Sequence, residues 1–186
     1  MGGGLRITHD DHVALLRDGV GGAGSLWADL GSGWGAFSLA LADLLGPAAV
    51  IHAVDRDAGA LRDLASSMRA SFPATSLEVH VADFTRDLSP ELGLEALDGV
   101  VMANSLHFSR RKEPVLERVQ RMLKPGGRLV LVEYNSDHGN PWVPWPISYP
   151  VWERLATSAG FTGTRLLETV PSRFLNEIYS ASSSRV

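Results

Sequence analysis

The sequence predicts an α/β fold in which a doubly wound, mostly parallel sheet is covered by helices on both faces. Three observations support this prediction: short apolar runs alternate with helical patterns, a glycine-rich turn follows the first run, and two strand-like runs close the chain. Strands separated by helical segments pair in parallel through right-handed crossovers. We therefore expect five parallel strands followed by a C-terminal antiparallel hairpin.

The individual elements follow from the spacing of apolar residues. Strands are expected at the apolar runs 25–30, 49–55, 77–83, 97–104 and 128–134. Helices are expected where apolar residues recur three or four positions apart, at 37–45, 61–68, 115–123 and 151–159. A short helix at 8–18 precedes the first strand, and the final hairpin joins 164–170 to 174–180.

Length and composition limit the class of protein. The 186 residues are 45% hydrophobic and 20% charged, which suits one core and one domain over residues 1–186. The absence of cysteine excludes disulfides, thiolate zinc sites and cysteine catalysis, and it favours a cytoplasmic location. We expect no export signal, no membrane association and, at a net charge of −4, no nucleic-acid partner.

A glycine-rich turn lies between the first strand and the first long helix. It reads Asp29-Leu30-Gly31-Ser32-Gly33-Trp34-Gly35. Glycines at such a turn let the backbone bend sharply and approach a ligand closely, and the helix that follows offers free N–H groups to an anionic group. The segment therefore indicates a ligand site.

Polar residues end the next three strands as well. Asp55 ends the second strand, where a carboxylate can accept both hydroxyls of a ribose. Asp83 and Phe84 end the third strand and suit the amine and ring face of a purine, and Asn104 ends the fourth. Each could be an ordinary turn or cap residue, but all lie at carboxyl ends of strands, where open α/β sheets bind ligands.

The chain resembles the class I S-adenosylmethionine-dependent methyltransferases in the order of these residues. The shared features are Asp29-x-Gly31-x-Gly33-x-Gly35, Asp55, Asp83, Asn104 and the Leu123-Lys124-Pro125-Gly126-Gly127 segment before an apolar strand. The resemblance covers nearly the whole chain and implies a Rossmann-like, seven-stranded methyltransferase fold. Within the family, the chain looks most like the small-molecule group typified by ubiquinone/menaquinone-biosynthesis methyltransferases.

The resemblance also implies a role for each cofactor-binding residue. Asp29, Leu30, Gly31, Ser32, Gly33 and Gly35 would hold the methionine part of S-adenosylmethionine. Asp55 would bind the ribose hydroxyls with Arg56 near the adenine, Asp83 and Phe84 would contact the adenine, and Asn104 would lie near the methionine moiety. S-adenosylhomocysteine would be the product.

The methyl acceptor is less clearly indicated than the cofactor. His107 is the candidate for a catalytic base, and a structural histidine at a strand end is the alternative. The loop 135–148 follows the fifth strand and is expected to cover the substrate, with Tyr134, Trp142 and Trp145 as candidate contacts. Alternatively, the two tryptophans pack as a local core. Residues 1–24 form the other segment available for substrate recognition.

Several alternatives remain open at this stage. The Gly31-x-Gly33-x-x-Ala36 pattern also suits an NAD-binding protein, and RNA methylation or cofactor binding without transfer would use the same fold. A homo-oligomer is left open. We expect no metal site, because Asp10 and Asp11 of His9-Asp10-Asp11-His12 are better explained as first-turn residues that complement a helix dipole.

Overall fold

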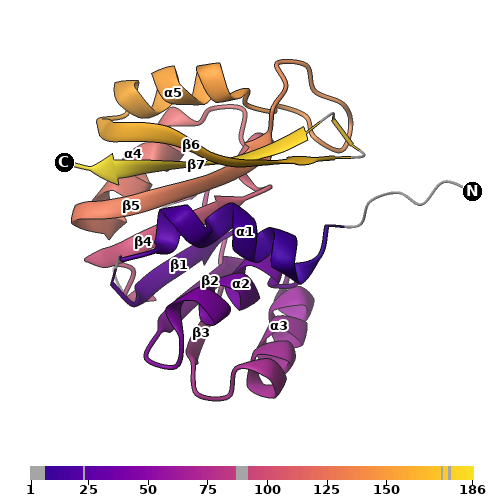
Figure 1. Ribbon diagram of the computed structural model, residues 1–186, viewed down its shortest axis with the longest axis vertical. Coiled ribbons are helices and arrows are strands. Elements are labelled where there is room, and N and C mark those ends of the chain that lie inside the picture. Colours follow the sequence, from indigo (N-terminus) through magenta and orange to yellow (C-terminus); the bar gives the residue numbers. More distant parts are fainter. Residues whose placement is uncertain (1–6, 23, 87–91, 173, 176) are drawn as a thin grey trace, which may run out of the picture.

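A single seven-stranded sheet organises the chain in the computed structural model, which describes residues 7–22, 24–86, 92–172, 174–175 and 177–186 (Figure 1). The strand order is β3-β2-β1-β4-β5-β7-β6. The first five strands pair in parallel, and β7 pairs antiparallel with both β5 and β6. The predicted fold class, with its C-terminal antiparallel hairpin, is confirmed.

The elements lie close to their predicted positions. The strands are β1 Leu26–Leu30, β2 Val50–Asp55, β3 Ser76–Val81, β4 Leu97–Ala103, β5 Leu123–Tyr134, β6 Phe161–Pro171 and β7 Glu177–Arg185. The helices are α1 His9–Val20, α2 Ala36–Leu45, α3 Ala58–Ser71, α4 Glu113–Met122 and α5 Tyr149–Ser158, with a short 3-10 turn at Leu106–Phe108.

Four strands have a boundary that differs from the prediction by two residues or more, and one of them, β6, begins at Phe161 instead of 164. β3 ends at Val81, so Asp83 lies in the turn beyond it. β5 begins at Leu123, five residues early, because the chain becomes extended directly after α4 and Leu123 pairs with Leu97 ahead of a register shift. The last strand runs from Glu177 to Arg185 instead of 174–180, since its buried serines lack the β-branched pattern that predicts strands.

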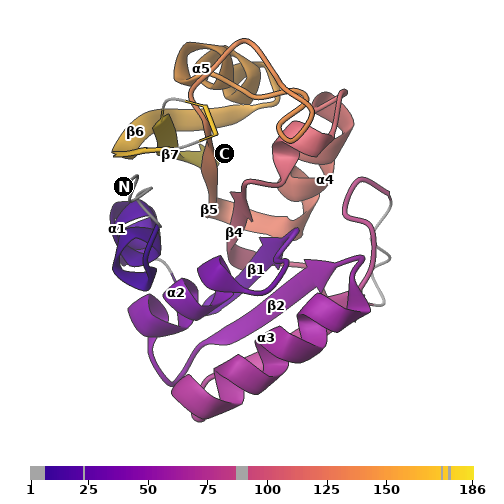
Figure 2. The same cartoon turned by 90° about the vertical axis from the view of Figure 1, so that its right-hand side faces the viewer.

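Helices cover both faces of the sheet. α1, α2 and α3 pack on one face, and α4 and α5 on the other; Figure 2 shows α1 and α2 on the opposite side of the sheet from α4. Leu64 of α3 and Trp152 of α5 are fully buried in the two resulting cores. No helix in the described part of the chain has the length and apolar character needed to cross a membrane.

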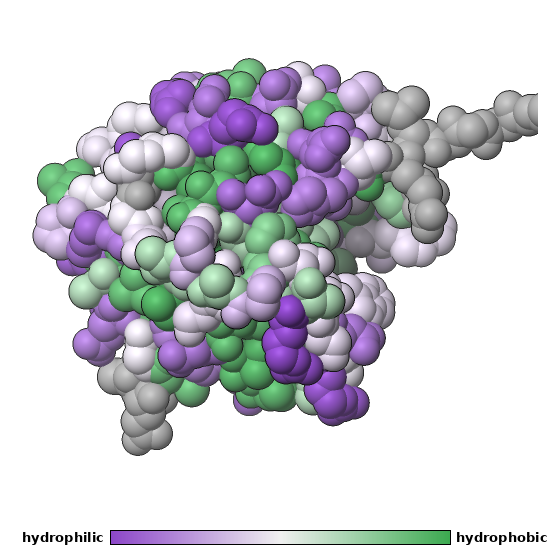
Figure 3. All heavy atoms as spheres, turned by 60° about the horizontal axis from the view of Figure 1, so that its bottom comes forward, coloured by the Kyte–Doolittle hydropathy of each residue, from purple (hydrophilic) through white to green (hydrophobic). Residues whose placement is uncertain are grey.

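The crossover from β3 to β4 departs from the regular alternation of strand and helix. Its described residues, 82–86 and 92–96, contain no α-helix. The outer edge strand β3 is also exposed on the face where α3 packs, and Val79 and Val81 keep 44% and 63% of their surface accessible. Figure 3, which brings the lower part of Figure 1 forward, shows apolar patches among hydrophilic ones on this side of the molecule.

Candidate functional site

The glycine-rich turn joins β1 to α2 at the carboxyl edge of the sheet. Gly31, Gly33 and Gly35 all have positive φ angles, of 81°, 50° and 86°. The N–H groups of Gly31 and Ser32 donate to the carbonyl of Val54 on β2, at 2.8 and 3.1 Å. The turn is therefore fixed against the neighbouring strand in a conformation that favours glycine.

Gly31 also packs closely against residues that follow β3 and β4. A Cβ atom at this position would lie 2.5 Å from Cβ of Ser105 and 3.0 Å from the ring of Phe84. The Ser105 hydroxyl donates to the carbonyl of Leu30 at 2.7 Å, so it ties the loop after β4 to the end of β1. Sequence reasoning missed Ser105; its position directly after Asn104 was the available signal.

Asp29 is a buried carboxylate next to this turn, with 1% of its surface accessible. Its Oδ2 atom accepts a hydrogen bond from the Ser38 hydroxyl at 2.6 Å, whereas Oδ1 is buried with no hydrogen-bond partner among the described residues. The pKa of Asp29 is raised from 3.8 to about 7, mainly because the carboxyl is buried and in smaller part because the charge of Asp55 is nearby. A positively charged ligand beside Asp29 would stabilise the ionised form of this carboxyl.

Asp55 ends β2 and is held by backbone donors. Oδ2 accepts from the Gly33 N–H at 2.8 Å, and Oδ1 accepts from the Asp57 N–H at 2.9 Å. A carboxylate oxygen has two acceptor positions, so each oxygen can accept one more hydrogen bond. The partly exposed side chain is thus oriented beside the glycine turn, and Arg56, next along the chain, is exposed.

Asp83 and Phe84 follow β3; Asp83 bonds to Thr85, and Phe84 lies against the glycine-rich turn. Oδ1 of Asp83 accepts from both the hydroxyl and the backbone N–H of Thr85, at 2.6 and 2.9 Å. The hydrogen bond from the Thr85 side chain keeps the pKa of Asp83 below its usual value. Phe84 is partly buried, and its ring approaches Gly31. The aromatic ring therefore lies nearer to the glycine turn than the sequence alone indicates.

Asn104 connects the ends of β4 and β5. It has a positive φ of 51°, and its N–H donates to the carbonyl of Val132 at 2.8 Å. Its Oδ1 atom is buried and has no hydrogen-bond partner in the described part of the chain, as is also true of Ser32 Oγ and Asp29 Oδ1. Unsatisfied buried oxygens are costly in isolation, and hydroxyl and ammonium groups of a ligand at this edge would satisfy them.

His107 forms a buried pair with Glu133 at the ends of β4 and β5. Its Nδ1 atom lies 2.9 Å from Oε2 and 3.2 Å from Oε1, and its backbone N–H donates to Oε1 at 3.0 Å. A carboxylate has no proton to donate, so Nδ1 carries the ring hydrogen and Nε2 is left as the acceptor. Sequence reasoning missed Glu133, which directly follows the apolar run 129–132 of β5.

The loop 135–148 presents its tryptophans to solvent. Trp142 and Trp145 retain 71% and 44% of their surface, while Val143 and Ile147 of the same loop are buried. The alternative that both tryptophans form a local core is therefore wrong. The Trp145 N–H donates to the carbonyl of His107 at 3.2 Å, which links the loop to the His107–Glu133 pair.

Tyr134 lies beside the His107 ring. Only 7% of its surface is accessible, and its ring centre is 5.6 Å from that of His107 in an edge-on arrangement. Of the three residues expected near a substrate, Tyr134 thus contacts the His107 ring and Trp145 bonds to the His107 backbone, while Trp142 lies on the same loop as Trp145.

The two N-terminal histidines have separate partners. His9 Nε2 lies 3.2 Å from Asp43, and the His12 ring packs edge-on against Phe37 at 4.7 Å. Asp11 accepts from the backbone N–H of Thr8 at 2.7 Å in a capping box, which agrees with a first-turn role.

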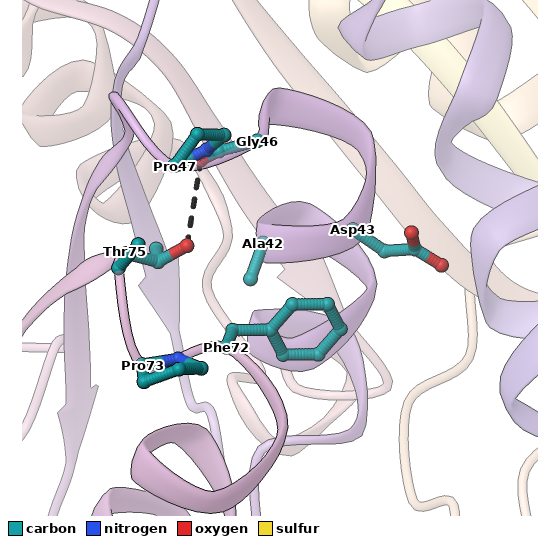
Figure 4. A pocket seen from close by; sticks show the side chains of 8 residues that line it. Ala42, Asp43, Gly46, Pro47, Phe72, Pro73 and Thr75 are labelled. Atoms are coloured by element: carbon teal, nitrogen blue, oxygen red, sulfur yellow. Dashed lines mark hydrogen bonds between the residues drawn. The ribbon is translucent and has the colours of Figure 1, made fainter.

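A cavity of about 180 Å³ lies away from this edge, where α2 and α3 end (Figure 4). Phe72 forms one of its walls and Asp43 and Thr75 contribute polar atoms. The Thr75 hydroxyl donates to the carbonyl of Gly46, which closes the turn after α2. None of the residues predicted to bind cofactor or substrate lines this cavity.

Comparison with known proteins identifies the family. Residues 25–158 match the model of a methyltransferase domain. A stretch of 96 residues is 32% identical to a highly reducing polyketide synthase of Calcarisporium arbuscula, covering 41% of this chain but only 4% of that protein. The chain thus spans a very small part of the curated relatives it matches.

Solved methyltransferase structures share the fold at low identity. A SAM-dependent methyltransferase from Aquifex aeolicus superposes with a TM-score of 0.71 at 18% identity, covering 95% of this chain and 90% of that one. A Burkholderia thailandensis 1,6-didemethyltoxoflavin-N1-methyltransferase, solved with S-adenosylhomocysteine, superposes with a TM-score of 0.72 at 16% identity over 96% of this chain and 78% of that one. The chain belongs to the class I S-adenosylmethionine-dependent methyltransferases.

Proposed function

We propose that this chain transfers the methyl group of S-adenosylmethionine to a small-molecule acceptor bound between His107 and the loop 135–148. The observation that carries the proposal is the set of three unpartnered buried oxygens, on Asp29, Ser32 and Asn104, near a turn whose three glycines all have positive φ angles. Such a site suits a polar ligand that brings several hydrogen-bond donors. We further propose that residues 1–186 act as one domain.

The cofactor's amino acid part is assigned to the turn after β1. Asp29 Oδ1 would accept from the ammonium group, and the Asn104 amide oxygen would accept a further donor from the same moiety. The turn from Leu30 to Gly35 would supply backbone N–H groups to the carboxylate, as helix N-termini do for anions. Gly31 lets this turn pack directly against Ser105, where a Cβ atom would clash.

The adenosine part is assigned to the ends of β2 and β3. Asp55 would accept the ribose hydroxyls on the two lone pairs that Gly33 and Asp57 leave free. Phe84 would pack on the adenine ring, with Asp83 and Arg56 at its polar edge. In this assignment each strand end contributes one part of the same elongated site.

His107 is proposed as the base that removes a proton from the acceptor. The cofactor supplies a methyl group already activated by its positive sulfur, so the protein has to position the acceptor and take up the proton it loses. Nε2 of His107 would accept that proton from an N–H, O–H or acidic C–H group, while Glu133 stabilises the imidazolium that forms. The acceptor's electron pair would form the new bond to the methyl carbon as the bond from that carbon to the cofactor's sulfur breaks, and the sulfur would keep that bond's electron pair in S-adenosylhomocysteine.

The acceptor is proposed to be small and partly apolar or flat. Trp142 and Trp145 offer exposed aromatic surface on a loop that bonds to His107, and Tyr134 adds a buried ring beside the same histidine. Polyketide synthases and a toxoflavin methyltransferase, the proteins that this chain resembles, are named for small-molecule products or acceptors. No large basic surface is implied by the net charge of −4.

A radiolabelled transfer assay tests this function. The protein is incubated with methyl-labelled S-adenosylmethionine and separate acceptor pools: small carbonyl compounds and heteroaromatic amines, total RNA, and unfolded protein. We expect label in a small-molecule pool only, and its loss in a His107→Gln variant that still binds S-adenosylhomocysteine. Label in RNA or protein would contradict the proposed acceptor class, and binding without transfer to any pool would contradict the enzymatic role.

A further inference from the structure

Three side chains on β2 and β3 form a cluster outside the site described above. His52 lies on β2, and Glu78 and His80 lie on β3. In the parallel pairing His52 is opposite Glu78, and His80 is opposite Val54, two residues further along. Because alternate residues of a strand share a face, all three side chains lie on the same face of the sheet.

The polar atoms of the cluster lie within the span of one metal coordination sphere. His52 Nδ1 lies 3.0 Å from His80 Nε2 and 3.8 Å from Glu78 Oε2. One ligand atom from each residue falls within 4.8 Å of the other two. Zinc binds imidazole nitrogens and carboxylate oxygens at about 2.0–2.2 Å in a tetrahedral arrangement, so neighbouring ligands in such a site lie a little over 3 Å apart.

The local fold leaves this cluster open to solvent on one side. His52 is 5% accessible, His80 is partly buried and Glu78 is exposed. The described residues of the β3–β4 crossover provide no α-helix over this part of the sheet. An ion could therefore enter from solvent, bind to two anchored imidazoles and keep water at a remaining position, as open zinc sites do.

The protonation of the two rings also suits metal binding. Burial lowers the pKa of both His52 and His80, which keeps the imidazoles neutral at pH 7. Two neutral rings in contact share one N–H···N hydrogen bond, so one ring must move its hydrogen to its other nitrogen before both lone pairs face an ion. That change is a tautomer shift and releases no net proton.

We propose that His52, Glu78 and His80 bind one divalent ion of the Zn²⁺ type. The donor set of two imidazoles and one carboxylate favours zinc over magnesium or calcium, which prefer sites made of oxygen ligands. A bound ion would join the edge strand β3 to β2. These two strands lead directly to Asp55 and Asp83, so the ion would stiffen the sheet beneath the carboxyl edge.

Calorimetric titration of the chelator-treated protein with ZnCl₂ tests the site. We expect one ion per chain. Binding should be at least about tenfold weaker in His80→Gln and in Glu78→Gln, because loss of even a residue that only hydrogen-bonds to a ligand lowers metal affinity about tenfold or more. His9→Gln and His138→Gln are matched controls, because both remove a histidine outside the cluster. Titration with MgCl₂ is expected to show no binding at this site.

The variants also separate ligation from folding. His80→Gln is expected to keep the circular dichroism spectrum and S-adenosylhomocysteine affinity of the parent protein. If it does not fold, Glu78→Gln decides, because that side chain is exposed and its removal leaves the sheet intact. Absence of binding to the parent protein, unchanged binding in Glu78→Gln, or loss of binding in His9→Gln would each overturn the proposal.

Discussion

Glu133 accepts both the backbone N–H and the ring Nδ1–H of His107, at 3.0 and 2.9 Å, in a region where neither residue has more than 2% of its surface accessible. The double contact fixes the ring orientation and the tautomer together. It joins two strand ends, since His107 follows β4 and Glu133 lies on β5. This contact supports the proposed role of His107 as a base that Glu133 orients.

Substitution of Glu133 tests whether this orientation serves catalysis. Glu133→Gln keeps the shape but offers one carbonyl oxygen instead of two charged ones, so it no longer stabilises the imidazolium. We expect kcat to fall, by up to the roughly 10²–10⁴-fold that a positioned base contributes, with little change in S-adenosylhomocysteine affinity. In His107→Gln, which removes the accepting ring nitrogen itself, kcat should fall at least as far, and an unchanged kcat would contradict the base assignment.

Gly31 provides a steric test of the cofactor site. Gly31→Ala would place Cβ 2.5 Å from Cβ of Ser105 and force a non-glycine residue to a φ of 81°. We expect loss of cofactor binding and destabilisation of about 1–3 kcal/mol, the range for a strained backbone position. Gly46→Ala is the control: it has a φ of 77° but no neighbouring atom within 4 Å, so it should show the strain without the loss of binding.

Asp29 predicts a specific pH dependence of stability. Its folded-state pKa of about 7 lies above the ordinary 3.8, so between these values the folded protein holds a proton that the unfolded chain has released. Its contribution to stability is therefore present below about pH 4 and is lost as the pH rises through 7. The unfolding temperature of Asp29→Asn, minus that of the parent protein, should therefore increase as the pH rises from 5 to 8.

The control for this measurement is Asp63→Asn, which changes an exposed carboxylate on α3. Its unfolding temperature should stay parallel to that of the parent protein across the same range. If the Asp29→Asn difference is also independent of pH, the buried carboxylate does not titrate as its environment implies.

Substitution of the tryptophans in the loop 135–148 is expected to weaken binding of the acceptor without weakening binding of the cofactor. Replacing Trp142 and Trp145 by Ala removes exposed aromatic surface while leaving the buried Val143 and Ile147 of the loop in place. We expect a higher KM for the acceptor, unchanged S-adenosylhomocysteine affinity and nearly unchanged stability, because exposed side chains contribute little to folding. Equal kinetics in parent and variant would exclude this loop as the substrate cover.

The sequence predicted those features of the site that follow from strand ends. Asp29, Asp55 and Asn104 each come directly at or after an apolar run, and parallel strands bring their carboxyl ends to one edge. Glu133 could not be found in this way, because a charged residue inside an apolar strand carries no sign of the partner that makes its burial tolerable. Ser105 likewise acts through a contact with β1 that depends on strand order.

The His52 cluster escaped sequence reasoning for a related reason. His52 and His80 are 28 residues apart, and only the register of β2 against β3 brings their ring nitrogens to 3.0 Å. The final strand was displaced in the prediction because Ser180, Ser182 and Ser183, which are buried beside β5 and β6, do not resemble strand residues. In both cases tertiary pairing outweighs the local pattern.

Binding of S-adenosylhomocysteine, measured by calorimetry on the parent protein, Asp55→Ala and Asp57→Ala, tests the central claim most directly. Asp57 is the matched control, since it lies two residues further on and its carboxylate caps α3 through the N–H groups of Gly59 and Ala60. We predict one site per chain, at least about tenfold weaker binding in Asp55→Ala, as expected for loss of hydrogen bonds to a charged group, and parent-like affinity in Asp57→Ala. Absence of binding to the parent protein, or equal affinity in Asp55→Ala, would contradict the account.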